Sequence, residues 1–317
     1  MSGISAAGLG VCLISLFGVA RVLAQETLTL PGSARVEEQK TFQGVPVLIV
    51  RPKVILPGAQ LVVLFHGFGP PASPASLARA LPLERLSSVL AYVNLPLVAG
   101  RLPAGGIEGL KRVQEKNFVN GFFFPSINGA STELPLIVHE IAREYHLDVR
   151  NGIGLFGFSA GGAAALLALM EPGVPVAAAA ILNAPLSVKE NVRNWEQALH
   201  RQFQWDAAAR AAADRYDVER QAGRIANRKP LPALLLMRGG ADESFDAEAV
   251  GRATAALRTA YEKENAGSKF AAKVFSGVGH NFGPDAKVTT SAPTTASDEI
   301  DDTVEHFFER YLMSASN

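Results

Sequence analysis

The chain has 317 residues, with 30 Lys and Arg, 30 Asp and Glu, and a formal net charge of zero. This length is enough for one large domain or two smaller ones. Nucleic-acid-binding domains usually carry clustered basic residues. No basic run interleaved with aromatic residues occurs here, so we exclude nucleic acid as a partner.

The first 24 residues resemble an export signal. An apolar run, ISAAGLGVCLISLFGVA, precedes VLAQE, in which Val22 and Ala24 fit a small-residue cleavage site. No Lys or Arg comes before the run, whereas signal peptides normally begin with a positive segment. We predict a signal peptide over residues 1–24, cleaved after Ala24, and a secreted or periplasmic protein without a stable membrane partner. An uncleaved N-terminal membrane anchor is the alternative.

Cys12 is the one cysteine of the chain and lies within this apolar run. Cleavage would leave a mature chain that can hold no disulfide, thiolate metal site or cysteine nucleophile. His, Asp and Glu do not cluster at metal-ligand spacing either. We therefore expect no metal and no cofactor.

After the leader, the segments TLTL, ARVEEQKTF and VPVLIVR suggest antiparallel edge strands. The apolar runs that follow are typical of strands buried on both faces of a parallel sheet. They span residues 61–65, 89–93, 152–156, 176–182, 233–237 and 270–275. Helical patterns fall between them, one after Ser131 and another after Ser297. This alternation predicts one doubly wound α/β domain over residues 25–317, with helices on both faces of a mostly parallel sheet.

Two longer segments interrupt the alternation. Residues 97–130 contain NFVNGFFFPSING, and residues 187–229 form a polar helical insertion that begins with a capping-box pattern. The second insertion stands where a cap over a site would attach. We take Phe122, Phe123 and Trp195 as candidate substrate-binding residues, with packing of the insertions against the domain as the alternative.

Ser159 lies in GFSAG, between an apolar strand and an alanine-rich helix. This context makes the G-x-S-x-G pattern a candidate nucleophile turn. Gly157 and Gly161 let the backbone approach closely on both sides of the serine. A serine hydroxyl is a weak nucleophile, so it needs a base that is oriented by an acid.

Candidates for the acid and the base follow Ser159 in the order that such hydrolases use. Asp242 comes just after the strand 233–237, and His280 comes just after the strand 270–275. We predict a Ser159, Asp242, His280 triad. Glu243 and Asp246 are neighbouring carboxylates, and Asp246 is more typical of a helix cap.

An oxyanion hole needs N–H groups that face the developing negative charge. The N–H of Ala160, directly after the nucleophile, is one candidate donor. The loop HGFG after the strand 61–65 supplies the other, which we assign to the N–H of Phe68. His66 then supports this loop and does not act as a base.

Taken together, LVVLFHGFG, GFSAGG, GGADESFD and GVGHNFG resemble the α/β-hydrolase superfamily. The chain is most similar to small secreted serine esterases related to dienelactone hydrolases and to the catalytic domain of prolyl oligopeptidases. The resemblance covers nearly the whole mature chain. It implies Ser159 as nucleophile, His280 as general base and Asp242 as its orienting residue. Phe68 and Ala160 correspond to the oxyanion donors.

These observations predict a serine hydrolase, a carboxylesterase that acts on a small-molecule ester through an acyl-enzyme. Dienelactone hydrolases use a cysteine nucleophile, so ring opening of dienelactones is not implied. One alternative is a peptidase or amidase of the prolyl-oligopeptidase-like type with the same triad. The other is a non-catalytic binding protein with this fold.

Overall fold

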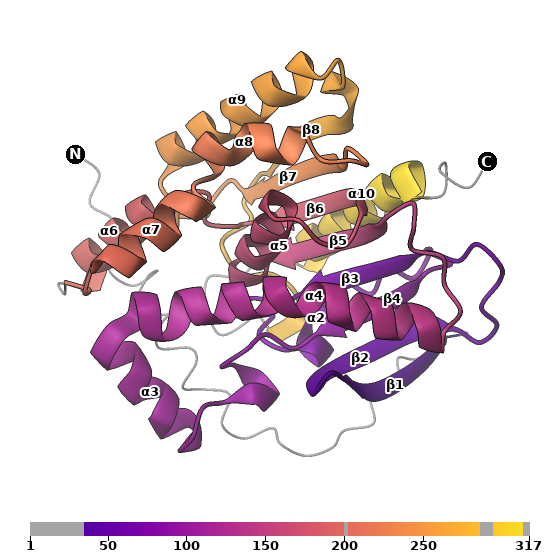
Figure 1. Cartoon of the computed structure of the whole chain (residues 1–317), viewed down its shortest axis with the longest axis horizontal. Helices are drawn as coiled ribbons and strands as arrows, with labels where there is room; N and C mark the ends of the chain where they lie inside the picture. The colour runs from indigo at the N-terminus through magenta and orange to yellow at the C-terminus, as the bar shows by residue number, and fades with distance from the viewer. Residues whose placement is uncertain (1–34, 200–201, 286–293, 313–317) are drawn as a thin grey trace.

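The computed structural model describes residues 35–199, 202–285 and 294–312, and it contains an eight-stranded sheet (Figure 1). The strands are β1 (Arg35–Phe42), β2 (Val45–Pro52), β3 (Leu61–Phe65), β4 (Val89–Val93), β5 (Ile153–Phe158), β6 (Val176–Leu182), β7 (Ala233–Gly239) and β8 (Phe270–Phe275). The predicted leader lies outside the described residues, so export stays a prediction.

The strand order in the sheet is β1-β2-β4-β3-β5-β6-β7-β8. The pairs β1/β2 and β2/β4 are antiparallel, and every pair from β4/β3 to β7/β8 is parallel. This mostly parallel sheet confirms the predicted α/β-hydrolase fold. Because parallel strands end at the same edge, the loops after β3, β5, β6, β7 and β8 all emerge on one side of the molecule.

Helices cover both faces of this sheet. They are α2 (Pro74–Ala80), α3 (Gly106–Asn117), α4 (Phe124–Glu144), α5 (Ala160–Met170), α6 (Val188–Leu199), α7 (Ala207–Tyr216), α8 (Val218–Ala226), α9 (Ala247–Lys263) and α10 (Thr294–Leu312). Short 3₁₀ turns span Ala99–Arg101 (η2) and Gly267–Lys269 (η4), and a π-helical turn spans Phe118–Phe123 (η3).

The side chains of the strands alternate between two cores. In β5, Ile153 and Leu155 join the core under α4, α5, α8 and α9, while Phe156 and Phe158 join the core under α2 and α10. Figure 1 shows α4 and α5 on the near face of the sheet and α10 behind it. The inner strands β3 to β7 are buried on both faces, which explains why their sequences are almost continuously apolar. The edge strand β8 differs from the prediction, because only its end residues Phe270 and Phe275 are buried.

The first insertion is more helical than the sequence predicted. Helix α4 begins at Phe124, well before Ser131, and π-helical η3 joins it to α3. Pro125 lies at the start of α4, where it has no N–H to donate to the π-helical turn before it. The predicted apolar stripe after Ser131 is nevertheless buried, as Leu134 and Ile137 show.

The last helix also starts earlier than predicted. Helix α10 begins at Thr294, so Ser297 lies within it and does not cap it. The hydroxyl of Ser297 instead accepts a hydrogen bond from the N–H of Gly283 at 3.0 Å. This bond ties α10 to the loop after β8.

The second insertion divides into two parts. Helix α6 begins directly after Ser187, as the sequence predicted, and Asp206 caps α7 by accepting from the N–H of Ala209 at 2.7 Å. Helix α8 packs against α5 and α9, so it belongs to the layer over the sheet. A cap over the site would therefore consist of α6 and α7 only.

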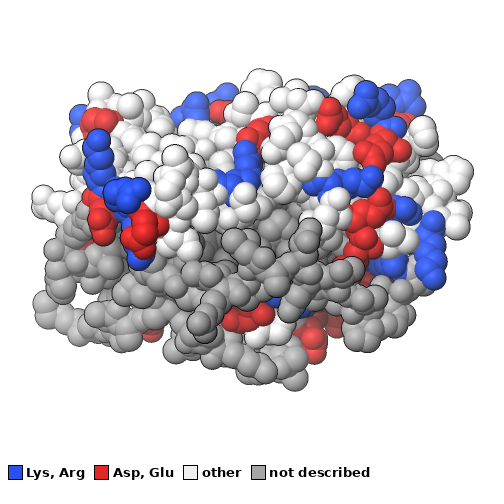
Figure 2. All heavy atoms as spheres, turned by 90° about the horizontal axis from the view of Figure 1, so that it is seen from below, with Lys and Arg blue, Asp and Glu red and all other residues white. Residues whose placement is uncertain are grey.

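Charged side chains of both signs are interspersed on the face that Figure 2 shows. This distribution agrees with a formal net charge of zero. Among the helices that the structure describes, none combines the length and the apolar character needed to span a bilayer.

Helix α10 holds the segment between α2 and β4 through carboxylates. Asp301 accepts from the N–H of Leu83 at 3.1 Å, and Glu305 accepts from the N–H of Arg85 at 2.7 Å. Burial raises the pKa of Asp301 to about 7, the hydrogen bond from Leu83 opposes this shift, and the nearby charge of Glu305 adds to it. Asp301 thus binds its proton more tightly in the folded chain than in the unfolded chain.

Asp301→Asn should stabilise the fold at high pH. The folded carboxyl keeps its proton up to about pH 7, while its ordinary pKa is 3.8, so wild type loses stability as the pH rises through this window. Asparagine does not titrate and keeps an acceptor for the Leu83 N–H. In urea denaturation, we expect the free energy of unfolding of the variant to exceed that of wild type by up to about 4 kcal/mol at pH 8 and by less than about 1 kcal/mol at pH 4.

Asp302→Asn is the matched control, because Asp302 lies on the same helix and its side chain is 56% exposed. A difference between Asp301→Asn and wild type that stays constant from pH 4 to pH 8 would contradict the expected titration.

Candidate active site

The strand β5 and the helix α5 are joined by Ser159 alone. Ser159 has φ 53° and ψ −119°, a conformation that non-glycine residues rarely adopt. Its N–H donates to the carbonyl of Leu182 on β6 at 3.0 Å, and its carbonyl accepts from the N–H of Ala163 at 3.0 Å. Both backbone groups are therefore fixed, and the turn places the side chain at the carboxyl edge of the sheet.

The glycines around Ser159 are required by close backbone contacts. A Cβ atom on Gly157 would lie 2.5 Å from the carbonyl oxygen of Gly161. A Cβ atom on Gly161 would lie 2.4 Å from the carbonyl oxygen of His66. The helix α5 can start directly after Ser159 because both positions lack a side chain.

The structure brings together the three residues predicted as a triad. The Oγ of Ser159 lies 2.9 Å from Nε2 of His280, and Nδ1 of His280 lies 3.0 Å from Oδ2 of Asp242. Asp242 follows β7 and His280 follows β8, as the sequence indicated. Ser159 is 6% exposed and Asp242 is 2% exposed, so the carboxylate is the member of this chain of hydrogen bonds that is most shielded from water.

The surroundings of Asp242 keep it ionised. Burial alone would raise the pKa of Asp242, but attraction to His280 and hydrogen bonds from His280 and Ser244 outweigh it and lower the pKa. The N–H of Ser244 donates to Oδ1 at 2.8 Å. The carboxylate accepts the Nδ1 proton of His280, which leaves Nε2 free of a proton and able to accept from the hydroxyl of Ser159.

Two aromatic rings flank the imidazole of His280. The ring of Phe245 lies edge-on, with its centroid 5.1 Å from the imidazole, and the ring of Phe158 lies 5.5 Å away. These contacts restrict rotation of the imidazole, so the hydrogen bonds to Ser159 and Asp242 are held by packing as well as by charge.

Asn183 is part of this arrangement, although the sequence analysis did not identify it. It follows β6 with φ 46° and is 2% exposed. Its Nδ2 donates to the carbonyls of Gly279 and His280, and its Oδ1 accepts from the N–H of Gly239. The signal in the sequence was an asparagine directly after a buried strand, because asparagine adopts a left-handed backbone conformation more readily than most residues.

The loop after β3 passes beside Ser159. A Cβ atom on Gly67 would lie 3.0 Å from the Cβ of Ser159, so Phe68 is next to the candidate nucleophile along this loop. Ala160 is the first residue of α5, and the first N–H groups of a helix have no acceptor within it. Phe68 and Ala160 thus each lie next to a residue of this contact, and the service of their N–H groups as oxyanion donors stays a prediction.

His66 supports this loop, as the sequence analysis predicted. It has no exposed surface; its Nδ1 donates to the carbonyl of Gly67 at 2.8 Å, and its Nε2 accepts from the N–H of Leu95 at 3.2 Å. Burial lowers the pKa of His66 to about 4, against the opposing effect of its hydrogen bonds with the carbonyl of Gly67 and the side chain of Asn94. A neutral imidazole therefore links the loop after β3 to the loop after β4.

The candidate substrate-binding rings lie behind the loop. Phe122 and Phe123 are 0% and 2% exposed, and the ring centroid of Phe68 lies 4.4 Å from that of Phe122 and 6.2 Å from that of Phe123. The two rings therefore support Phe68 in this structure, and direct contact with a substrate stays a prediction. The side chain of Trp195 lies outside the described residues, so its predicted contact also stays a prediction.

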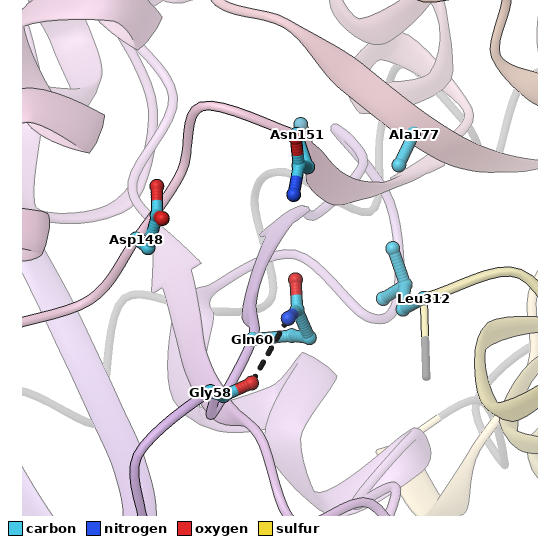
Figure 3. Close-up of a pocket in the computed structure, with 7 residues that line it drawn as sticks. Gly58, Gln60, Asp148, Asn151, Ala177 and Leu312 are labelled. Carbon is cyan, nitrogen blue, oxygen red and sulfur yellow. Dashed lines mark hydrogen bonds between the residues drawn. The ribbon is translucent and has the colours of Figure 1, made fainter. Parts of the chain in front are cut away.

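A cavity of about 180 Å³ lies at the opposite edge of the sheet (Figure 3). It opens between the amino ends of strands β3, β5 and β6, whereas Ser159 follows the carboxyl end of β5. Its lining residues are Gly58, Gln60, Asp148, Asn151, Gly152, Ala177 and Leu312. This cavity is separate from the candidate site. Across the described part of the chain, His, Asp and Glu side chains do not gather in groups of three that could hold a metal ion.

The chain matches one known protein family over more than half of its length. The model of the prolyl oligopeptidase family matches residues 136–313, more than half of the chain, and this range contains Ser159, Asp242 and His280. The chain belongs to the prolyl oligopeptidase family. It is therefore a serine hydrolase of the α/β-hydrolase superfamily. No curated protein matches the chain by sequence.

Solved structures share the fold of this prolyl oligopeptidase family member. The protein TT1662 from Thermus thermophilus has 19% sequence identity and a TM-score of 0.64, over 88% of this chain and 98% of that chain. The acylaminoacyl peptidase of Pyrococcus horikoshii has 14% identity and a TM-score of 0.62, over 88% of this chain and 42% of that chain. The esterase Pf2001 of Pyrococcus furiosus has 14% identity and a TM-score of 0.52, over 88% and 93%. At these identities the similarity shows the fold alone.

Asp242→Asn should lower kcat for ester hydrolysis by about 10⁴-fold, the loss seen when the triad aspartate of a serine protease is changed in this way. An asparagine amide can donate to Nδ1 of His280, which would move the proton to Nε2. That nitrogen could then no longer accept the proton of Ser159. Steady-state hydrolysis of p-nitrophenyl butyrate measures the effect.

Asp246→Asn is the matched control. Asp246 caps α9 by accepting from the N–H of Ala249 at 2.7 Å, and asparagine caps helices as well as aspartate does. Full activity in Asp242→Asn together with a loss in Asp246→Asn would show that the wrong acid has been chosen.

Proposed function

We propose that this chain hydrolyses carboxylic esters through an acyl-enzyme formed on Ser159. The observation that carries the proposal is the continuous set of hydrogen bonds from Ser159 through His280 to Asp242, at 2.9 and 3.0 Å. Membership of the prolyl oligopeptidase family supports the same chemistry. A nucleophile, a base within hydrogen-bond reach and an acid that orients the base are the parts that covalent acyl transfer requires.

In the proposed acylation step, Oγ of Ser159 attacks the carbonyl carbon of the ester while its proton moves to Nε2 of His280. The carboxylate of Asp242 stabilises the imidazolium that forms. The N–H groups of Phe68 and Ala160 would donate to the oxyanion of the tetrahedral intermediate. When the intermediate collapses, the ester C–O bond breaks and the alcohol leaves with the proton from Nε2.

Water completes the proposed cycle. His280 removes a proton from a water molecule as the water oxygen attacks the acyl carbon. The bond between the acyl carbon and Oγ of Ser159 then breaks, and Oγ takes the proton from Nε2. The products are a carboxylic acid and the regenerated enzyme. The strained backbone of Ser159 need not change during either half-reaction, because only its side-chain oxygen exchanges bonds.

Esters fit this set of groups better than peptides do. An alkoxide leaves a tetrahedral intermediate more readily than an amine, so an ester makes the smaller demand on proton donation by His280. A peptide also needs subsites for its backbone on both sides of the cleaved bond. The family and the similar fold of an acylaminoacyl peptidase keep peptide hydrolysis as the alternative outcome of the tests below.

Ser159→Ala should abolish ester hydrolysis and labelling by a fluorophosphonate probe. The expected loss in kcat is about 10⁶-fold, the scale for removal of a triad nucleophile, because no other group can form the acyl-enzyme. The fold should persist, since the change removes one oxygen at a turn. Probe labelling followed by mass spectrometry, together with steady-state kinetics, measures both effects.

Ser88→Ala provides the matched control, because Ser88 is also buried but lies directly before β4, away from the turn. It should label and turn over like wild type. Labelling of the Ser159→Ala protein, or more than a tenth of wild-type activity, would rule out Ser159 as the nucleophile. A wild-type protein that the probe does not label would favour the non-catalytic reading.

Esters with short to medium apolar acyl groups should be the preferred substrates. The loop beside Ser159 rests on an aromatic cluster that contains Phe68, Phe118 and Phe122. Of these rings, Phe68 belongs to the loop beside Ser159 itself, and an apolar side chain at that place favours apolar acyl groups over charged ones. We expect kcat/KM for p-nitrophenyl butyrate to exceed the values for the palmitate and for a succinate monoester by at least about tenfold.

A matched panel of p-nitrophenyl esters and p-nitroanilides with the same acyl groups checks this order. Palmitate ranking above butyrate would contradict the acyl preference. Anilides ranking above esters would instead identify a peptidase.

A further inference from the structure

Asn183 connects three of the strand ends that form the site. Its N–H donates to the carbonyl of Met237 on β7 at 3.0 Å, and the preceding residue, Leu182, accepts from the N–H of Ser159 at 3.0 Å. The backbone at Asn183 is thus held between the nucleophile turn and the end of β7. Its φ of 46° turns the side chain away from the direction in which a continuing strand would place it.

The side chain of Asn183 makes three hydrogen bonds to backbone groups. Its Nδ2 donates to the carbonyl of Gly279 at 3.0 Å and to the carbonyl of His280 at 2.8 Å. Its Oδ1 accepts from the N–H of Gly239 at 2.7 Å. A planar amide with two donors and one acceptor meets all three groups at once, which the side chains of aspartate, serine or leucine cannot do.

These hydrogen bonds hold the backbone of His280 in place. The loop after β8 is also joined to the loop after β7 by backbone bonds, from Gly240 to Phe275 at 2.8 Å and from Ala241 to Val278 at 2.9 Å. Asn183 adds a bond to the carbonyl of His280 itself. At 2% exposure the amide is shielded from competing water, so loss of its donors would remove two hydrogen bonds that hold the backbone at Gly279 and His280.

We propose that Asn183 is a positioning residue that holds His280 within reach of Ser159. It acts through the backbone of the histidine and does not touch the reacting atoms. The proposal rests on the proposed function of the triad, because its effect on rate requires His280 to be the base. Without the Nδ2 donors, the loop at Gly279 and His280 would relax, and the 2.9 Å contact between Ser159 and His280 would open.

Asn183→Asp is the most informative variant. Aspartate has the same shape and also tolerates a positive φ. It keeps an acceptor for the N–H of Gly239, but it presents a carboxylate oxygen to the two carbonyls. Asn183→Gly is the second variant, since glycine adopts this φ without strain and removes all three bonds. Asn265→Asp is the matched control, because Asn265 has φ 55° at the exposed end of α9 and precedes the amino end of β8, at the opposite edge of the sheet from the triad.

We expect both Asn183 variants to lower kcat for p-nitrophenyl butyrate by about 10²-fold with KM changed less than about twofold, as small displacements of a catalytic group do. Circular dichroism and thermal unfolding should show a folded protein. The strongly deshielded proton NMR signal of Nδ1–H in His280, hydrogen-bonded to Asp242, should broaden or vanish in both variants. Asn265→Asp should match wild type in all these measurements.

Folded variants with wild-type kcat and an unchanged Nδ1–H signal would overturn the proposal. So would a rise in KM with kcat intact, or loss of the fold in both variants, because either result would assign Asn183 another role. Failure of the proposed function can be distinguished from failure of the proposal for Asn183. In that case wild type would neither hydrolyse esters nor label at Ser159, while the NMR comparison would still report whether Asn183 positions His280.

Discussion

The one-residue turn at Ser159 is the constraint on which the rest of the site depends. A non-glycine residue at φ 53° carries a strain of about 1–3 kcal/mol, and it persists only where its surroundings leave the chain no alternative. Here the carbonyl of Leu182 accepts from the N–H of Ser159, and α5 starts at the next residue. The close approach of Gly161 to His66 brings the helix against the end of β3. The turn therefore fixes the serine oxygen, the first turn of α5 and the loop beside them as one unit.

The parallel sheet supplies the remaining alignment. The ends of β5, β6, β7 and β8 lie next to one another in the sheet, so residues far apart in sequence meet at one edge. Asp242 and His280 come from the loops after β7 and β8, and Asn183 bridges both loops from the end of β6. Beyond the ends of the strands, hydrogen bonds between these loops hold them together, as the hydrogen bonds between strands do within the sheet. The order and register of the strands therefore determine which loop residues meet at this edge.

Features with a local cause were predictable from the sequence. The buried strands followed from continuous apolar runs, and the nucleophile turn followed from glycines on both sides of Ser159. The cap at Asp246 was also local, because it depends on residues within one helical turn. The proximity of Ser159, Asp242 and His280 was predictable because each follows a strand of the parallel sheet, and such strands end at one edge.

Features that depend on distant contacts were not predictable in this way. Helix α4 starts at Phe124 because η3 continues directly into it, and a π-helical turn has no simple pattern of polar and apolar residues. Ser297 resembled a helix cap, but its hydroxyl bonds to Gly283 in a separate loop. The role proposed for Asn183 depends on carbonyls almost 100 positions away, which a reading of neighbouring residues cannot reveal. The same separation applies to Phe122, whose ring is buried in an insertion and packs on Phe68 in the loop after β3. Under the proposed function, this insertion would act on the rate through the position of that loop, without contributing a group that touches the substrate.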